Sequence, residues 1–133
     1  MGAAFAQKPA LHIVVGYPPG GSNDLVARIL QPHLSAELGV PVVIDTKAGA
    51  NGTVGAGAVA NAAPDGNTLL LTSASPVAVA PHVMKASFDT VRDFAPISMI
   101  GRTPEALGVS PNSPALTLAQ FLERAKREDL RNP

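Results

Sequence analysis

The 133-residue sequence contains no cysteine. This absence excludes disulfide bonds, thiolate nucleophiles and zinc sites built on cysteine. The chain also lacks an excess of charge of either sign, because ten basic residues balance ten acidic ones. A neutral chain offers no basic surface for nucleic acid or for an anionic membrane. We therefore expect no nucleic-acid partner, and a small anion would have to be bound by local dipoles.

Long apolar runs are also missing, so we expect neither a membrane-spanning segment nor direct insertion into a membrane. Hydrophobic residues still make up 46% of the chain, which is enough for the core of one modest domain. The N-terminal Ala4-Phe5-Ala6 resembles the A-x-A cleavage end of a secretory signal, without the charged and apolar regions that precede such a site. Residues 1–7 are therefore either a signal-peptide remnant or a disordered terminus.

Short apolar segments alternate with amphipathic or alanine-rich segments. Strands are expected at residues 11–15, 41–45 and 69–71, with a fourth in 93–100 and a fifth at 107–110. Helices are expected at residues 23–38, 54–62, 76–84 and 117–128. Strands separated by helices predict an α/β fold, in which flanking helices cover a mostly parallel sheet.

Ligands bind such sheets at the carboxyl ends of the strands, where loops lead into helix N-termini. The first of these loops contains the motif PPGGSND at residues 18–24. Its glycines let the backbone approach a ligand, and the free N–H groups of a helix start favour an anion. A tight turn into a helix capped by Ser22 or Asn23 explains the same residues. The motif is neither a P-loop nor a dinucleotide-binding pattern.

Two further loops, at residues 47–53 and 72–75, are expected at the same edge. The glycines of KAGANGTVGAG allow close approach to a ligand or to a neighbouring strand, or they form a flexible loop before a closely packed helix. Thr72, Ser73 and Ser75 place hydroxyl groups at a strand end, where polar residues are also common without a ligand. Two glycine-rich loops at one sheet edge favour a binding site there.

No group of residues indicates catalysis. His12, His33 and His82 have no metal-ligand spacing, and the chain contains neither a G-x-S-x-G elbow nor a pair of acid and base carboxylates. We therefore expect a protein that is not an enzyme and that needs no metal or cofactor. An enzyme domain that binds a nucleotide or phosphate at PPGGSND stays an alternative.

Several motifs occur in an order that is typical of one receptor family. They are Tyr17 with PGG and Asp24, VVIDTKAGANG at 42–52, ANAAPDGNTL at 60–69, and FDTVRDFAPIS at 88–98. Over residues 11–125 the chain resembles the Bug family, the periplasmic solute receptors of tripartite tricarboxylate transporters. The resemblance implies a two-lobed venus-flytrap fold, a periplasmic location, and delivery of a small carboxylate to the membrane subunits of a transporter. It also favours the signal-peptide interpretation of residues 1–7.

The resemblance further implies a binding site made by the three loops, without catalytic or metal-binding residues. Backbone amides and small hydroxyl groups would hold the carboxylate, Tyr17 would pack on the solute, and Asp24 would order the first loop or bind through water. The predicted ligand-binding residues are Tyr17, Gly20, Gly21, Ser22, Asp24, Asn51, Gly52, Thr53, Thr72, Ser73 and Ser75.

Receptors that this chain resembles are much longer than 133 residues. We therefore expect a first α/β lobe at residues 8–102 and the start of an incomplete second lobe at residues 103–133, with exposed apolar surface. A flytrap binds by closing two lobes around its ligand. A truncated, non-binding remnant of a receptor is therefore a further alternative.

Overall fold

The computed structural model describes residues 9–127. The chain divides into two units, one up to Ile97 and one from Ser98 onward, and each is described by itself. The expectations for residues 1–7, and for the end of the last helix at Glu128, lie outside the described residues.

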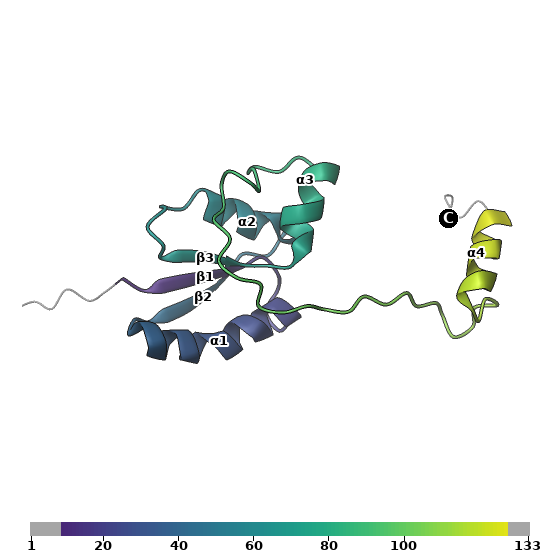
Figure 1. Cartoon of the computed structure of the whole chain (residues 1–133), viewed down its shortest axis with the longest axis horizontal. Coiled ribbons are helices and arrows are strands. Elements are labelled where there is room, and N and C mark those ends of the chain that lie inside the picture. Colours follow the sequence, from purple (N-terminus) through teal and green to yellow (C-terminus); the bar gives the residue numbers. More distant parts are fainter. Residues whose placement is uncertain (1–8, 128–133) are drawn as a thin grey trace, which may run out of the picture. The chain divides into compact units, whose positions relative to one another are not determined.

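The first unit is built on a three-stranded parallel sheet (Figure 1). β1 (Leu11–Val15) lies between β2 (Val42–Thr46) and β3 (Thr68–Leu71). The last residue of β1 pairs with Thr46 on one side and with Leu71 on the other. All three carboxyl ends therefore meet at one edge of the sheet. This sheet and its flanking helices confirm the predicted α/β class.

The core of the first unit lies between the sheet and α1 (Ser22–Leu38), where three alternate residues of β1 and Ala27 of α1 are buried. Alternate strand residues point to opposite faces, so the buried Val14 lies on the face that α2 (Thr53–Ala60) covers. Figure 1 shows α1 and α2 on opposite sides of the strands. Right-handed crossovers require this arrangement when β2 and β3 flank β1 on different sides.

The start of α1 differs from the expectation by one residue, because the helix begins at Ser22. Gly21 occupies the N-cap position and makes no side-chain cap. Instead, the carboxylate of Asp24 accepts the N–H of Gly20 at 2.9 Å. The prediction of Ser22 or Asn23 as the N-cap is therefore wrong. The side chain that accepts a backbone N–H at the start of this helix is Asp24, within the first turn.

The single helix expected after β3 is instead a π-helical turn, η2 (Ser75–Val79), followed by the short α3 (Ala80–Val83). Pro81, in α3, has no N–H to donate to the carbonyl of Val77 four residues earlier. That carbonyl accepts the hydroxyl of Thr90 at 2.8 Å. A side chain from a later loop thus supplies the bond to this carbonyl that Pro81 cannot make.

The strands expected in 93–100 and at 107–110 are wrong. Neither segment pairs with another strand within the described residues. A strand exists only through hydrogen bonds to a neighbour, and most apolar side chains of these segments are exposed, apart from the half-buried Phe94. Ile97 is 78% exposed and Leu107 is 73% exposed. An apolar run is thus insufficient evidence for a strand.

The second unit contains irregular chain followed by α4 (Leu118–Arg127). Thr117 caps this helix as expected, because its hydroxyl oxygen accepts the N–H of Gln120 at 3.3 Å. The side-chain oxygen of Gln120 accepts the N–H of Thr117 at 3.2 Å in return, which completes a capping box. Among the described residues, no helix combines the length and the apolar character needed to cross a membrane.

Candidate functional site

Three loops lie at the carboxyl edge of the sheet. β1 leads into residues 16–21, β2 into residues 47–52, and β3 into residues 72–74. Because the strand order is β2-β1-β3, the first loop lies between the other two. This edge is where open parallel sheets bind ligands.

Side-chain hydrogen bonds join the three loops. The hydroxyl of Tyr17 lies 2.9 Å from the Oγ of Ser73, and it donates more weakly to the carbonyl of Asn51 at 3.4 Å. The side-chain amide of Asn51 donates to the Oγ of Ser75 at 2.6 Å. Four of the predicted site residues therefore form one connected group.

Three glycines explain why the first two loops lie so close together. A Cβ atom on Gly16 would be 2.7 Å from the carbonyl oxygen of Gly52, and one on Gly55 would be 2.7 Å from the Cα of Gly16. Gly52 is buried beneath the ring of Tyr17 and beside Pro76. Of the roles considered for Gly52 and Gly55, the structure shows close approach to neighbouring protein atoms, and Gly16 allows the same approach from the first loop.

Backbone strain is concentrated in the second loop. Ala50 and Asn51 have positive φ angles of 44° and 53°, although neither is glycine. They belong to the short turn η1 (Ala50–Gly52). Such conformations cost free energy and persist where surrounding contacts impose them, often at binding sites. Here Asn51 is bonded to Tyr17 through its carbonyl and to Ser75 through its side chain.

Asp24 lies beneath the first loop, with only 2% of its surface exposed. Its Oδ2 accepts the N–H of Gly20 and the Nε–H of Arg28, each at 2.9 Å. The Arg28 hydrogen bond, and next to it the Gly20 bond, hold the pKa of this carboxyl below its usual range. Its Oδ1 is buried without a hydrogen-bond partner in the described part of the chain. One carboxylate oxygen of Asp24 therefore connects the first loop with Arg28 of α1.

An open pocket of about 360 Å³, here called the carboxyl-edge pocket, lies at the start of α1. Its lining combines two prolines, an aromatic ring, hydroxyl groups and helix-start backbone. The lining residues are Tyr17, Pro18, Pro19, Gly21, Ser22, Asn23 and Ser73. The first N–H groups of a helix have no partner within the helix and form its positive end. The pocket can therefore accept a small anion with an apolar body.

The other predicted site residues lie outside this lining. Gly20 gives its N–H to Asp24, and Thr53 donates its hydroxyl to the carbonyl of Ala50 at 2.8 Å. The Oγ1 of Thr72 is buried without a partner among residues 9–127. The hydrogen bonds of Gly20 and Thr53 thus hold the first two loops, and neither residue lines the pocket.

Sequence reasoning missed four residues of this region. Pro18, Pro19 and Asn23 line the pocket, although only the glycines and serine of their motif were predicted to bind. Arg28 was missed as well, and it pairs with Asp24 four residues earlier on α1. That spacing is a standard signal for an ion pair on a helix, so the sequence did contain the information.

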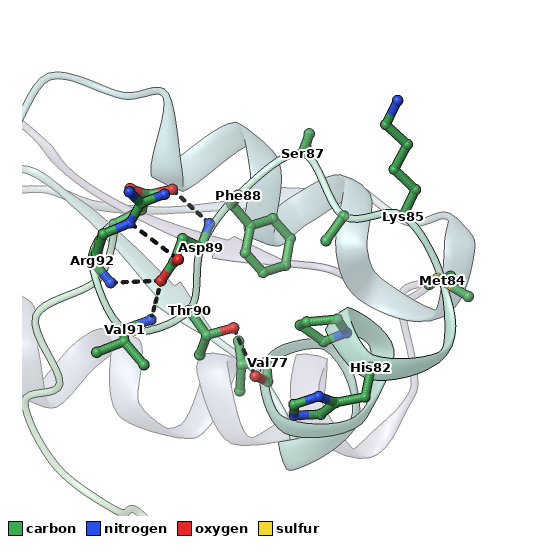
Figure 2. Close-up of a pocket in the computed structure, with 13 residues that line it drawn as sticks. Val77, His82, Met84, Lys85, Ser87, Phe88, Asp89, Thr90, Val91 and Arg92 are labelled. Carbon is green, nitrogen blue, oxygen red and sulfur yellow. Dashed lines mark hydrogen bonds and ion pairs between the residues drawn. The ribbon is translucent and has the colours of Figure 1, made fainter.

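A larger hollow of about 760 Å³ lies on the first unit between η2, α3 and the loop that follows them (Figure 2). The carboxylate of Asp89 accepts the backbone N–H groups of Val91 and Arg92 at 2.9 and 3.0 Å, and the Arg92 Nε–H at 3.1 Å. The Arg92 N–H, followed by that of Val91, lowers the pKa of Asp89. These charged groups are thus used to fold the loop, and the carboxyl-edge pocket is the better candidate site.

Residues 26–131 match the family described as the tripartite tricarboxylate transporter family receptor. Protein BugT of Bordetella pertussis is 39% identical over 118 residues, which cover 87% of this chain and 36% of that protein. A relative from Cupriavidus necator is 36% identical over 122 residues, covering 92% of this chain and 37% of that protein. The chain thus spans about a third of the length of these relatives.

Solved structures with similar folds include a periplasmic transporter, with a TM-score of 0.73 and 36% identity over 95% of this chain and 42% of that chain. A Rhodopseudomonas palustris protein solved with adipate has a TM-score of 0.70 and 28% identity over 90% of this chain and 40% of its own. MatC of the same organism, solved with malate, has a TM-score of 0.55 and 34% identity over 65% and 30% of the two chains.

Proposed function

Because the chain belongs to the receptor family of tripartite tricarboxylate transporters, we propose that its carboxyl-edge pocket binds a small carboxylate in the periplasm. The protein then delivers this solute to the membrane subunits of a transporter. Family membership confirms the resemblance inferred from the motifs, and it makes the chain a receptor rather than an enzyme. The fold is that of periplasmic binding proteins, as the sequence predicted.

The position of the pocket at the N-terminus of α1 carries this proposal. α1 has 17 residues, so its first turn presents unpaired N–H groups at the positive end of a long helix. A carboxylate beside Ser22 and Asn23 would accept hydrogen bonds from this turn without needing a basic side chain. A protein with zero net charge can bind an anion in this way.

The remaining walls of the pocket suit the carbon chain and the polar groups of such a solute. The ring of Tyr17 and the two prolines offer apolar surface, while Ser22 and Ser73 offer hydroxyl groups. Asn51 and Ser75 support the Tyr17 side of the pocket from the neighbouring loops. We assign Gly20, Gly52, Thr53 and Thr72 to the support of these loops.

Similar structures suggest which solutes to test first. One was solved with malate and one with adipate, and both solutes carry two carboxylate groups. This chain spans about a third of the length of its curated relatives, so its own solute, its transporter and its division into lobes at residue 102 all belong to the proposal.

Thermal unfolding of the full chain tests the proposal. The panel contains malate, adipate, monocarboxylates, amino acids and nucleotides, each at several millimolar concentrations. A ligand that binds only the native state raises the unfolding midpoint by mass action. We expect a rise with at least one carboxylate and none with nucleotides.

Two variants locate the effect. Ser73→Ala removes a hydroxyl from the pocket wall, and Ser98→Ala removes an exposed hydroxyl from the second unit. Only the first should reduce the rise in midpoint. A cooperatively folded sample that responds to no carboxylate would contradict the proposal, and a response to nucleotides alone would favour the phosphate-binding alternative.

A further inference from the structure

The predicted role of Asp24 left two possibilities open, ordering of the loop or contact with the solute. We propose that Asp24 is a positioning residue whose carboxylate fixes the turn at residues 18–21 and thereby shapes the carboxyl-edge pocket before the solute binds. Arg28 serves as its counterion. The part of this inference that concerns solute affinity rests on the proposed function of the pocket.

The geometry of the turn supports this role. Residues 18, 19 and 21 line the pocket, while Asp24 is absent from the lining and buried beneath them. Within the turn, the N–H of Gly21 donates to the carbonyl of Pro18 at 3.4 Å, which is long for a hydrogen bond. The Asp24 carboxylate holds Gly20 at 2.9 Å, so it is the stronger tether.

The conformation of Gly20 makes this tether necessary. Gly20 has a φ angle of +85°, and a Cβ atom placed on it would meet no atom within 4 Å. Its left-handed conformation is therefore open to solvent and not imposed by packing. Glycine loses more backbone entropy on folding than any other residue, so keeping Gly20 in one conformation costs free energy. The bond to Asp24 supplies the missing restraint.

The charge of Asp24 is balanced within α1. The carboxylate lies in the first helical turn, where the positive end of the helix favours it, and Arg28 pairs with it at 2.9 Å. The side chain of Asp24 is 4% exposed, whereas that of Arg28 is 57% exposed. A buried carboxylate can thus stay ionised beneath an anion site, because its partner cancels the negative charge that would repel the solute.

Amide NMR of the solute-free full chain tests the tether directly. In the native protein, the Gly20 amide signal should shift when Asp24 titrates, with a midpoint below the ordinary aspartate value of 3.8. Arg28→Gln removes the largest cause of the lowered pKa and should move that midpoint upward. Asp24→Asn should abolish the titration. A Gly20 signal that follows the same course in the native chain and in Asp24→Asn would overturn the inference.

Affinities for malate and adipate test the consequence for the pocket. Asp24→Ala removes the acceptor for Gly20 and should weaken binding about tenfold, as expected for the loss of a hydrogen bond to a charged group. Asp24→Asn keeps an oxygen that can accept the Gly20 N–H and should recover most of the affinity. Equal affinities of all three proteins would overturn the positioning role.

The two arms separate this inference from the proposed function. If the native chain binds neither malate nor adipate, and no other member of the panel, the proposed function fails, and the Gly20 titration still decides whether Asp24 holds the turn. If Asp24→Ala does not fold, the NMR titration and the affinity measurement are both made with Arg28→Gln and Asp24→Asn.

Discussion

The hydroxyl of Tyr17 lies 2.9 Å from the Oγ of Ser73, although 56 residues separate them in the sequence. The contact is possible because β1 and β3 are parallel neighbours, so that the residues following both strands meet at one edge. Through the carbonyl and the side chain of Asn51, the same group of bonds reaches Ser75 in η2. The protein's own contacts therefore link all three loops of the candidate site.

Tyr17→Phe should separate the hydroxyl bonds of Tyr17 from the packing of its ring. The ring lies against Gly52 and stays in the variant, so the free energy of unfolding should fall by only about 0.5–1 kcal/mol. Solute affinity should fall as well, because Ser73 loses the partner that orients it. Urea unfolding and calorimetric binding measure the two effects.

A double-mutant cycle provides the control for this prediction. Ser73→Ala removes the other partner of the same bond, so the combined variant should lose less stability than the two single losses added together. Strict additivity would mean that the Tyr17–Ser73 bond contributes nothing to stability.

Two substitutions of Asn51 should separate the contribution of its backbone strain from that of its side-chain bond. Asn51→Gly removes the bond to Ser75 but tolerates the φ angle of 53°. Asn51→Ala removes the same bond and keeps a Cβ in a left-handed conformation, so it should be about 1 kcal/mol less stable than the glycine variant. Urea unfolding of both variants measures the difference. Equal stabilities would show that the loop relaxes out of this conformation.

Gly16→Ala should be a strongly damaging substitution near the site. The added Cβ would lie 2.7 Å from the carbonyl oxygen of Gly52 and 2.9 Å from its Cα, and backbone cannot rotate away as a side chain can. We expect a loss of about 1–3 kcal/mol in the free energy of unfolding. Gly101→Ala is the matched control, because a Cβ there meets no atom within 4 Å. A Gly16→Ala protein as stable as this control would refute the close packing of the loops.

The regular part of the fold could be predicted because local pattern and tertiary structure agree there. β1 is a short apolar segment buried on both faces, and Gly39 ends α1 with a φ angle of 63°, as a helix-terminal glycine does. The order of these elements also placed the three loops at one sheet edge. Parallel topology brings the loops of Tyr17, Asn51 and Ser73 to the same edge.

The predictions that were wrong or incomplete concern features that depend on contacts distant in the sequence, which a local sequence pattern does not contain. The segment ending at Ile100 has the composition of a strand but no partner strand in the described residues. Pro81 is visible in the sequence, whereas the hydroxyl of Thr90 that bonds the carbonyl of Val77 comes from a later loop. Likewise, no pattern shows that Gly52 is buried against Tyr17, because the direction of a loop is set by its neighbours.

Acid should destabilise the first unit through carboxylates whose pKa is lowered by folding. Asp24 is the buried example, and hydrogen bonds from Arg28 and then Gly20 lower its pKa below 3.8. Asp65 is an exposed example, in which the Asn67 N–H is the main cause of the lowered pKa. A group whose pKa is lower in the folded state stabilises the protein fully above its unfolded pKa. That contribution disappears as the pH falls through the folded value.

We therefore expect the urea midpoint to fall when the pH drops below about 4, as these groups take up protons. Arg28→Gln removes the largest cause of the lowered Asp24 pKa, so this variant should be less stable than the native chain at pH 7. It should also lose less stability between pH 5 and pH 3, because less of the Asp24 contribution remains to be lost. An acid dependence identical to that of the native chain would mean that the Asp24–Arg28 pair is not coupled to folding.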